Sequence, residues 1–574
     1  MPIEQNSTVN GKKILLALLP FWTPLNPPLG IASLKTFLQD KGYHVKAVDA
    51  NVDVESKKIY NQYIETLNRC VPKNKRGKSY DIVHDVLRNQ MMAHINSRDK
   101  REYLELLEVL LYKYFYVHFN NSQVLELTEI LDEFYSGLEK YLINLLDKEC
   151  PTLFGLSVFS STLPASVFAF KLVREKYPHI KTVMGGGIFD DQLAVGTSNL
   201  KFFLEKTKDY IDRIIIGEGE SLFLKLLRGD LPESQRVYTL DDIHQEVLEL
   251  SSVNIQDFTD FNLREYPYMS AFISRGCPYQ CAFCSETVRW GKYRRKTISQ
   301  AVEELIKLNE NHNSRLFLMT DSLLNPVITD LSRELIKSGV SFYLDGYIRV
   351  DRNVCDMQNT LLWRRGGLYR ARLGVESGSQ YILDSMNKKI IPGQIKEAVS
   401  SLASAGIKTS TLWIVGYPGE TEEDFQQTLA LIEELKDDIY EIRSNPFSYH
   451  LEGQVSSNIW AENYKSTSLF PQEAEMLMTQ TWILECEPSR EEVYNRLNRF
   501  TAHCNGLNIP DPYSLQEICQ ADQRWKSLHK NAVPSFLQLL EFKNNGIEFV
   551  DEYKNGKEFN FARDVSRLIY ECEF

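Results

Sequence analysis

Short apolar segments alternate with amphipathic ones along the first part of the chain. Residues 12–22, KKILLALLPFW, form an apolar run of strand length, and an amphipathic segment at 27–42 leads to a second apolar run at 43–51. After residue 150 the alternation resumes, with apolar runs at 152–160, 180–189 and 211–221. Strands that alternate with helices in this way predict a doubly wound α/β domain with a parallel sheet.

A second alternation begins near residue 268. Its expected strands are at 268–276, 314–322, 340–348, 369–377 and 409–421, and its expected helices are at 298–312, 328–339 and 394–406. This pattern predicts a second parallel sheet. Ligands of such sheets bind at the carboxyl ends of the strands.

The remaining segments complete a domain plan. Residues 54–150 have helical periodicity and few helix breakers, which predicts a helical insertion within a first domain at 1–230. A polar, acidic linker at 231–262 leads to a second domain at 263–460, and residues 461–574 form a mainly helical carboxyl-terminal domain.

Composition changes this picture only by excluding classes of protein. With 43% hydrophobic and 25% charged residues in 574, the chain is an ordinary globular protein. A net charge of −12 argues against a nucleic-acid partner, and no apolar stretch approaches the ~20 residues that span a bilayer. The ten cysteines do not form a disulfide framework in so long a chain, which indicates the reducing cytoplasm.

Three cysteines are closely spaced in the segment RGCPYQCAFCSET, at Cys277, Cys281 and Cys284. A structural zinc site needs a fourth ligand, but no histidine lies between His244 and His312 and the next cysteine is Cys355. Three thiolates suit a 4Fe–4S cluster with one iron left open, whereas ferredoxin runs have a fourth nearby cysteine. The spacing therefore favours a redox cluster over zinc.

The Cys-x3-Cys-x2-Cys spacing and the alternation after it resemble the radical S-adenosylmethionine (SAM) superfamily. The resemblance covers residues 268 to about 450 and implies a partial (β/α) barrel in which the open iron binds SAM. One electron from the cluster then cleaves SAM to a 5′-deoxyadenosyl radical. The positions that match the family's SAM contacts are Phe283 near adenine, Asp321 and Ser322 near the methionyl part, Glu376 and Ser377 near ribose, and Gly416, Pro418 and Glu420 after the last strand.

Some of these positions have simpler interpretations. Arg349 and Arg372 offer bidentate contacts to a carboxylate, or a salt bridge at a strand end. Glu420 is a SAM contact or a cap of the helix that follows it. No catalytic acid or base is identified.

The first domain resembles the Rossmann-like cobalamin-binding domain that precedes many radical SAM domains, from its PPLG opening to its GEGE close. Glycines at the strand ends let a bulky ligand approach the backbone, at Gly185, Gly186, Gly187, Gly217 and Gly219. Many cobalamin domains have Asp-x-His-x-x-Gly after the first strand, but this chain has neither aspartate nor histidine between Leu19 and Leu34. We therefore expect cobalt without a histidine lower ligand, or a degenerate domain used only for packing.

Together these resemblances imply a cobalamin-dependent radical SAM methyltransferase that acts on an unactivated carbon of a specialised metabolite. The implied cofactors are a 4Fe–4S cluster, SAM and cobalamin, and the implied partners are a small-molecule substrate and an electron donor such as flavodoxin or ferredoxin. Two alternatives remain. One is a radical SAM cyclase, oxidase or mutase that uses cobalamin without methyl transfer. The other is a cobalamin or redox sensor without turnover.

Overall fold

The computed structural model describes residues 12–53, 55–76 and 79–554, and the predicted domains extend beyond these at both termini. The described chain divides into two compact units. The first comprises residues up to 266 with 288–290 and 448–485, and the second comprises 267–287, 291–447 and residues from 486 onward. These units divide the chain differently from the predicted boundaries, because the segment 448–485 joins the first unit.

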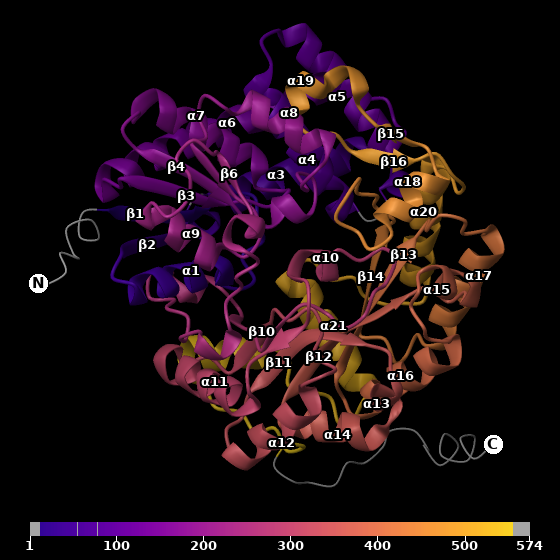
Figure 1. The fold of residues 1–574 in the computed structure, drawn as a ribbon. Coiled ribbons are helices and arrows are strands. Elements are labelled where there is room, and N and C mark those ends of the chain that lie inside the picture. The colour runs from indigo at the N-terminus through magenta and orange to yellow at the C-terminus, as the bar shows by residue number, and fades with distance from the viewer. Residues whose placement is uncertain (1–11, 54, 77–78, 555–574) are drawn as a thin grey trace, which may run out of the picture. The chain divides into compact units, whose positions relative to one another are not determined.

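The first unit contains a six-stranded parallel sheet in the order β2-β1-β3-β4-β5-β6 (Figure 1). Its strands are β1 (Lys13–Leu18), β2 (His44–Asp49), β3 (Leu153–Ser157), β4 (Lys181–Gly185), β5 (Arg213–Ile215) and β6 (Val237–Tyr238). The predicted doubly wound fold is confirmed, and the strand order reverses between β1 and β3. Strand β6 comes from the segment predicted as a linker.

Helices cover both faces of this sheet. They are α1 (Leu29–Asp40), α7 (Leu163–Lys176), α8 (Ser198–Lys206) and α9 (Gly219–Arg228). Helix α1 packs against α9, and Figure 1 shows α7 on the opposite side of the sheet. The predicted insertion is helical, with α2 (Ala50–Asp53), α3 (Ser56–Cys70), α4 (Ser79–Asn96), α5 (Lys100–Phe115) and α6 (Asn121–Glu149). Helix α4 packs on α7, so the insertion is part of this unit's core.

The segment 448–485 adds small elements to the first unit. They are α18 (Ser457–Asn463), β15 (Ser466–Ser468), α19 (Ala474–Leu477) and β16 (Trp482–Leu484). Strands β15 and β16 pair antiparallel, and α19 packs on α4 of the insertion. The side chain of Asn199 also donates to the backbone oxygen of Gln480 at 3.0 Å.

The second unit contains the predicted partial barrel. Its strands are β7 (Met269–Ala271), β10 (Leu316–Met319), β11 (Tyr343–Arg349), β12 (Leu368–Glu376), β13 (Lys408–Val415) and β14 (Glu441–Pro446). They pair in parallel in chain order, from β7 at one edge to β14 at the other. The crossover helices include α11 (Ile298–His312), α12 (Ile328–Ser338), α14 (Met357–Gly366), α16 (Pro392–Ser404) and α17 (Glu422–Glu434). The single strand predicted at 268–276 is divided, because β8 (Ser274–Arg275) pairs instead with β9 (Arg294–Arg295).

The carboxyl-terminal helices pack on both ends of the barrel strands. They are α20 (Arg490–Gly506), α21 (Leu515–Leu528) and α22 (Phe536–Asn545). Tyr343 and Tyr369, at the amino ends of β11 and β12, form a buried cluster with Val533 and Phe536. Helix α20 instead packs on β13, β14 and α17. Helices α20 and α22 therefore belong to the core of the barrel unit.

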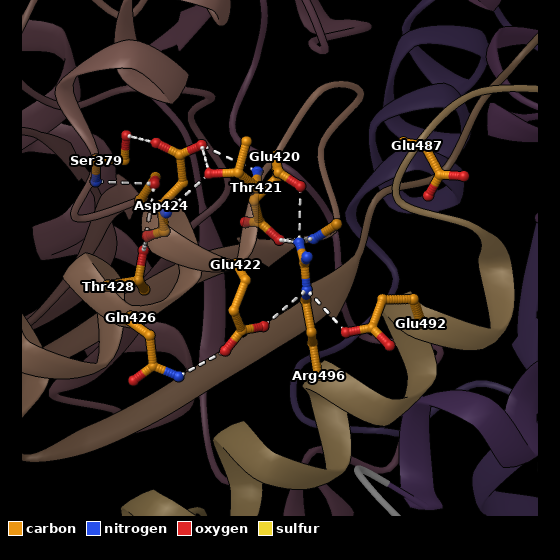
Figure 2. A network of polar contacts seen from close by, with 12 residues as sticks. Ser379, Glu420, Thr421, Glu422, Asp424, Gln426, Thr428, Glu487, Glu492 and Arg496 are labelled. Carbon is orange, nitrogen blue, oxygen red and sulfur yellow. Dashed lines mark hydrogen bonds and ion pairs between the residues drawn. The ribbon is translucent and has the colours of Figure 1, made fainter.

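A buried ion pair attaches α20 to the turn after β13 (Figure 2). Glu420 Oε2 accepts hydrogen bonds from the Gly416 backbone N–H at 3.0 Å and from Arg496 Nη1 at 2.9 Å. Gly416 has φ +76°, and a Cβ there would lie 2.3 Å from a methyl carbon of Val493. Any larger residue would push α20 away. Gly416 and Glu420 thus hold α20, and neighbouring Pro418 is buried in the same turn. The cap of α17 is Thr421 rather than Glu420. The contacts of Gly416, Pro418 and Glu420 with SAM stay predictions.

This ion pair predicts a pH-dependent stability. Burial raises the pKa of Glu420 to about 7, although Arg496 and the Gly416 N–H lower it in part. Its pKa in the unfolded chain is about 4.3. Between about pH 4.3 and about pH 7 the Glu420 carboxyl therefore keeps its proton in the folded state and loses it in the unfolded state. The Glu420 contribution to the free energy of unfolding is therefore largest at low pH and declines as pH rises toward 7. Urea unfolding of the barrel unit at pH 5.5, 6.5 and 7.5 measures this decline.

We expect Glu420→Gln to flatten this decline. The matched control is Glu422→Gln on the same turn, because Arg499 lowers the pKa of Glu422 to about 2 and it does not titrate in this range. An unchanged slope in Glu420→Gln, or an equal flattening in Glu422→Gln, would show that Glu420 is not the titrating group.

Candidate functional site

The three clustered cysteines lie in the loop between β8 and α10 (Glu286–Trp290) of the barrel unit. All three are free thiols, and Cys281 is buried whereas Cys277 and Cys284 are half-buried. The Cys284 backbone N–H donates to the Cys281 carbonyl at 3.0 Å, which folds the loop back on itself. The loop begins at Gly276, whose φ of +84° favours glycine. The sequence spacing thus becomes a compact thiol-lined turn.

The electrostatics of the loop favour occupation by a cation. Burial raises the pKa of Cys277 and raises that of Cys284 to about 12, and the neighbouring thiols add to both shifts. The thiolates therefore need positive charge, which iron supplies when it displaces the protons. Among the described residues, no three His, Cys, Asp or Glu side chains converge on a single metal ion. Three thiolates in one loop suit a 4Fe–4S cluster, which binds each thiolate to a different iron.

Asp321, after β10, anchors the backbone that leads into the cysteine loop. Its carboxylate accepts from the Ser274 backbone N–H at 2.6 Å, from the Ser274 hydroxyl at 2.5 Å and from the Ile273 N–H at 3.1 Å. Burial raises the pKa of Asp321 to about 6, and these hydrogen bonds oppose the shift. Next to it, Ser322 donates to the carboxylate of Glu286, just after Cys284. The two predicted residues therefore bind the segments that flank the cysteine loop, and their contact with SAM stays a prediction.

The structure brings together Phe283 and Glu376, which the sequence places far apart. Lys388 connects them, because its Nζ lies 2.6 Å from Glu376 Oε1 and 5.7 Å from the centre of the Phe283 ring. The Ala282 N–H also donates to the Met386 carbonyl at 2.9 Å, so the loop before Lys388 is docked on the cysteine loop. These three side chains form a polar and aromatic surface beside the cysteines.

Glu376 lies at the carboxyl end of β12 in an unusual conformation. Its φ is +71°, and the register of β12 against β13 shifts between Gly374 and Glu376. A bulge that ends a strand re-aims its side chains, and a strained non-glycine residue at such a place is typical of ligand sites. The next residue, Ser377, is buried and accepts from the Ser379 N–H at 3.1 Å. Ser379 caps the following helix, because its side chain accepts from the Ile382 N–H, and Ser377 holds this cap residue in place. The predicted ribose contact of Ser377 stays a prediction.

The two arginines with alternative interpretations have different partners. Arg372 forms a bidentate ion pair with Asp345, with contacts of 2.7 and 2.9 Å, which agrees with the salt-bridge interpretation. Arg349 instead donates to the sulfur of Cys281 at 3.1 Å. Only the second arginine therefore contacts the cysteine loop.

The predicted glycines of the first unit have mixed surroundings. Gly185 ends β4. Gly186 has φ +109°, and a Cβ there would lie only 2.5 and 2.6 Å from the backbone nitrogen and oxygen of Val158. Gly217 has φ +101°, and a Cβ there would lie 3.1 Å from the Leu240 side chain, whereas a Cβ at Gly219 would meet no atom within 4 Å. Gly186 and Gly217 are therefore explained by packing, and contacts of these glycines with cobalamin stay predictions.

A cavity of about 250 Å³ opens at the carboxyl ends of β1, β3 and β4 in the first unit. It lies at the reversal of strand order, where doubly wound sheets bind their ligands. The rings of Trp22 and Phe159, after β1 and β3, lie 4.7 Å apart at its wall. Gly187 and Asp191 line it from the segment after β4. Gly187 is thus the predicted glycine that reaches a cavity.

The helical insertion also contributes to this cavity, which the sequence did not indicate. His84 and Arg88 of α4 line it, and Arg88 Nη1 donates to Ser160 Oγ at 2.7 Å. His84 Nε2 lies 2.9 Å from the Tyr60 hydroxyl of α3. Charged residues spaced along a helix usually indicate a solvent-exposed face, so no sequence signal distinguished these two. Arg496 of α20 was missed for the same reason, and Lys388 was missed because it lies in a loop where no pattern marks it.

No described helix is long and apolar enough to cross a bilayer. Residues 272–432 match the sequence profile of the Radical SAM superfamily.

Curated relatives match about half of the chain. An anaerobic magnesium-protoporphyrin IX monomethyl ester cyclase of Rubrivivax gelatinosus is 25% identical over 317 residues, which are 50% of this chain and 55% of that protein. An uncharacterized methyltransferase of Pyrococcus horikoshii is 23% identical over 323 residues, or 51% of this chain and 66% of that protein. The chain thus spans about half to two thirds of the length of these relatives.

Solved structures extend the likeness to most of the fold. The radical SAM methyltransferase TsrM of Kitasatospora setae, solved with cobalamin and a 4Fe–4S cluster, has a TM-score of 0.58 at 13% identity and covers 93% of this chain and 100% of its own. The cobalamin-dependent SAM radical enzyme OxsB has a TM-score of 0.51 at 16% identity and covers 82% of this chain and 57% of its own. Residues 272–432 therefore form a Radical SAM domain, and the wider fold of the chain is similar to that of cobalamin-dependent radical SAM enzymes.

Proposed function

We propose that this protein is a cobalamin-dependent radical SAM methyltransferase that acts on an unactivated carbon of a specialised metabolite. The observation that supports this most is the pairing, in one chain, of the cysteine loop at the barrel strand ends with a cavity at the strand-order reversal of a doubly wound sheet. Likeness in fold to TsrM, which is a methyltransferase, favours methyl transfer among the reactions of such enzymes.

The residues of the barrel unit have distinct roles in this proposal. Cys277, Cys281 and Cys284 hold the 4Fe–4S cluster, whose chemistry when bound is the delivery of one electron to SAM. Asp321 fixes the backbone before Cys277 and so sets the position of the thiols. Glu376 accepts hydrogen bonds from a bound nucleoside, and Lys388 holds its carboxylate in place.

The first unit supplies the second cofactor site. We propose that cobalamin, which serves as a methyl carrier when bound, occupies the edge of the sheet where Trp22, Phe159 and Gly187 line the cavity. An electron donor such as flavodoxin or ferredoxin and a small-molecule substrate complete the proposed set of partners. The proposed location is the reducing cytoplasm.

One alternative has support of its own. Some of the relatives are cyclases. They match this chain over about the same length, and at about the same identity, as the methyltransferase relative does. A cyclase, oxidase or mutase would use the same cysteine loop for radical formation without passing a methyl group to the product.

We expect the anaerobically reconstituted protein to bind one 4Fe–4S cluster. The variant Cys277→Ala, Cys281→Ala, Cys284→Ala should lose nearly all cluster iron and sulfide, because it removes every proposed ligand. Cys355→Ala, which removes a half-buried thiol elsewhere in the barrel unit, should keep the full cluster. Iron and sulfide counts measure both. A full cluster in the triple variant would refute the assignment.

We expect the cob(II)alamin form to lack an axial nitrogen ligand, because the usual histidine motif is missing and His84 Nε2 already lies within hydrogen-bond distance of Tyr60. Its electron paramagnetic resonance (EPR) spectrum should show no nitrogen superhyperfine splitting, and His84→Gln should leave it unchanged. Strong splitting that His84→Gln abolishes would assign the ligand to the insertion instead. Absence of cobalamin binding would favour a domain used only for packing.

We expect incubation with methyl-labelled SAM, cobalamin, a reductant and candidate metabolites to give labelled product, 5′-deoxyadenosine and S-adenosylhomocysteine. Mass spectrometry of the three compounds tests methyl transfer, and the triple cysteine variant is the control. Substrate-dependent 5′-deoxyadenosine without label in the product or S-adenosylhomocysteine would establish the cyclase, oxidase or mutase alternative. A protein that binds both cofactors but never cleaves SAM would be a sensor.

A further inference from the structure

Arg349 places a positive charge against one of the three cysteine sulfurs. It ends β11, and its Nη1 donates to Cys281 Sγ at 3.1 Å. Both residues are deeply buried, with exposed fractions of 6% and 7%. A charged hydrogen bond that is shielded from water acts at nearly full strength on its acceptor. The sulfur of Cys281 therefore lies in a different electrostatic environment from an ordinary thiol.

The donors to the other two sulfurs are uncharged. The backbone N–H of Tyr279 donates to Cys277, and that of Glu286 donates to Cys284. Of these three donors, only the one to Cys281 is cationic. It is also the only donor of the three that a side-chain substitution can remove.

Arg349 is held in place from several sides. Asn325 accepts from the Arg349 N–H at 2.8 Å and donates to its carbonyl at 2.9 Å, which fixes the end of the strand. The Tyr279 ring, two residues after Cys277, lies 4.1 Å from the guanidinium carbon. The guanidinium is thus clamped between the strand and the cysteine loop, and its orientation toward Cys281 follows from these contacts.

The charge of Arg349 is not neutralised as those of its neighbours are. Arg370 and Arg372, on the adjacent strand, both pair with the buried Asp345. In the described part of the chain, no carboxylate lies within ion-pair distance of Arg349, whose side-chain contacts are the Cys281 sulfur and the Tyr279 ring. A buried cation normally requires a negative partner. A thiolate of an iron–sulfur cluster supplies that partner.

We propose that Arg349 is a positioning residue that acts through Cys281 to raise the reduction potential of the cluster. The inference rests on the cluster assignment of the proposed function. Reduction adds one negative charge to the cluster and its thiolates, so a fixed cation that donates to a sulfur stabilises the reduced state more than the oxidised state. Arg349 thereby makes the cluster easier to reduce by an external electron donor.

The test compares reconstituted full-length variants in an EPR-monitored redox titration with dithionite. Arg349→Met removes the charge and the donor, and we expect the equilibrium constant for one-electron reduction to fall about tenfold, which corresponds to a potential about 59 mV more negative. Arg349→Lys keeps the charge and should shift the potential less. Arg372→Gln is the matched control, because it removes a guanidinium of the same sheet that binds Asp345 and no cysteine; it should leave the potential nearly unchanged.

The outcomes separate this inference from the proposed function. Iron and sulfide are counted first, and a wild-type protein without a cluster would refute the cluster assignment itself. A full cluster in Arg349→Met with the wild-type potential would overturn the role of Arg349 alone. An equal shift of the reduction potential in Arg372→Gln would overturn it as well, because the loss of any nearby positive charge would then have the same effect. Loss of the cluster from both Arg349 variants would show a role in assembly and would also overturn the proposal.

Discussion

The carboxylate of Asp321 fixes the loop on which the rest of the site depends. It accepts from two successive backbone N–H groups, of Ile273 and Ser274, and thereby ends β7 and turns the chain toward Cys277. A neutral side chain would satisfy fewer of these donors, and buried N–H groups without acceptors are costly. This anchored turn fixes the start of the cysteine loop, which Met386 and Arg349 then hold further along.

Buried charges in the barrel unit occur mostly as local pairs that fix strand ends. Asp345 holds two arginines within the sheet, Glu376 holds Lys388 beside the cysteine loop, and Glu420 holds α20 on the turn after β13. Removal of one partner from such a pair leaves an uncompensated charge, so these sites tolerate little change. Arg349 differs because its partner is a sulfur.

Strand and helix order could be predicted from the sequence, because each apolar run is local and its period is clear. The cysteine spacing likewise identified the site, since those residues are close in sequence. Lys388, Arg496 and Arg88 could not be predicted, because each reaches its partner only through the fold and each resembles a surface residue of a helix or loop. Asp321 was predicted as a SAM contact, but the sequence could not show that its carboxylate oxygens accept hydrogen bonds from the protein's own backbone.

The segment that closes the amino ends of the barrel strands is also the part of the barrel that is synthesised last. Strands β7 to β14 leave the ribosome before Val533 and Phe536, so Tyr343 and Tyr369 are exposed during that interval. Apolar surfaces that wait for a distant segment are prone to aggregate. The order of synthesis thus leaves this apolar cluster uncovered until α22 emerges, and the cysteine loop emerges well before that point.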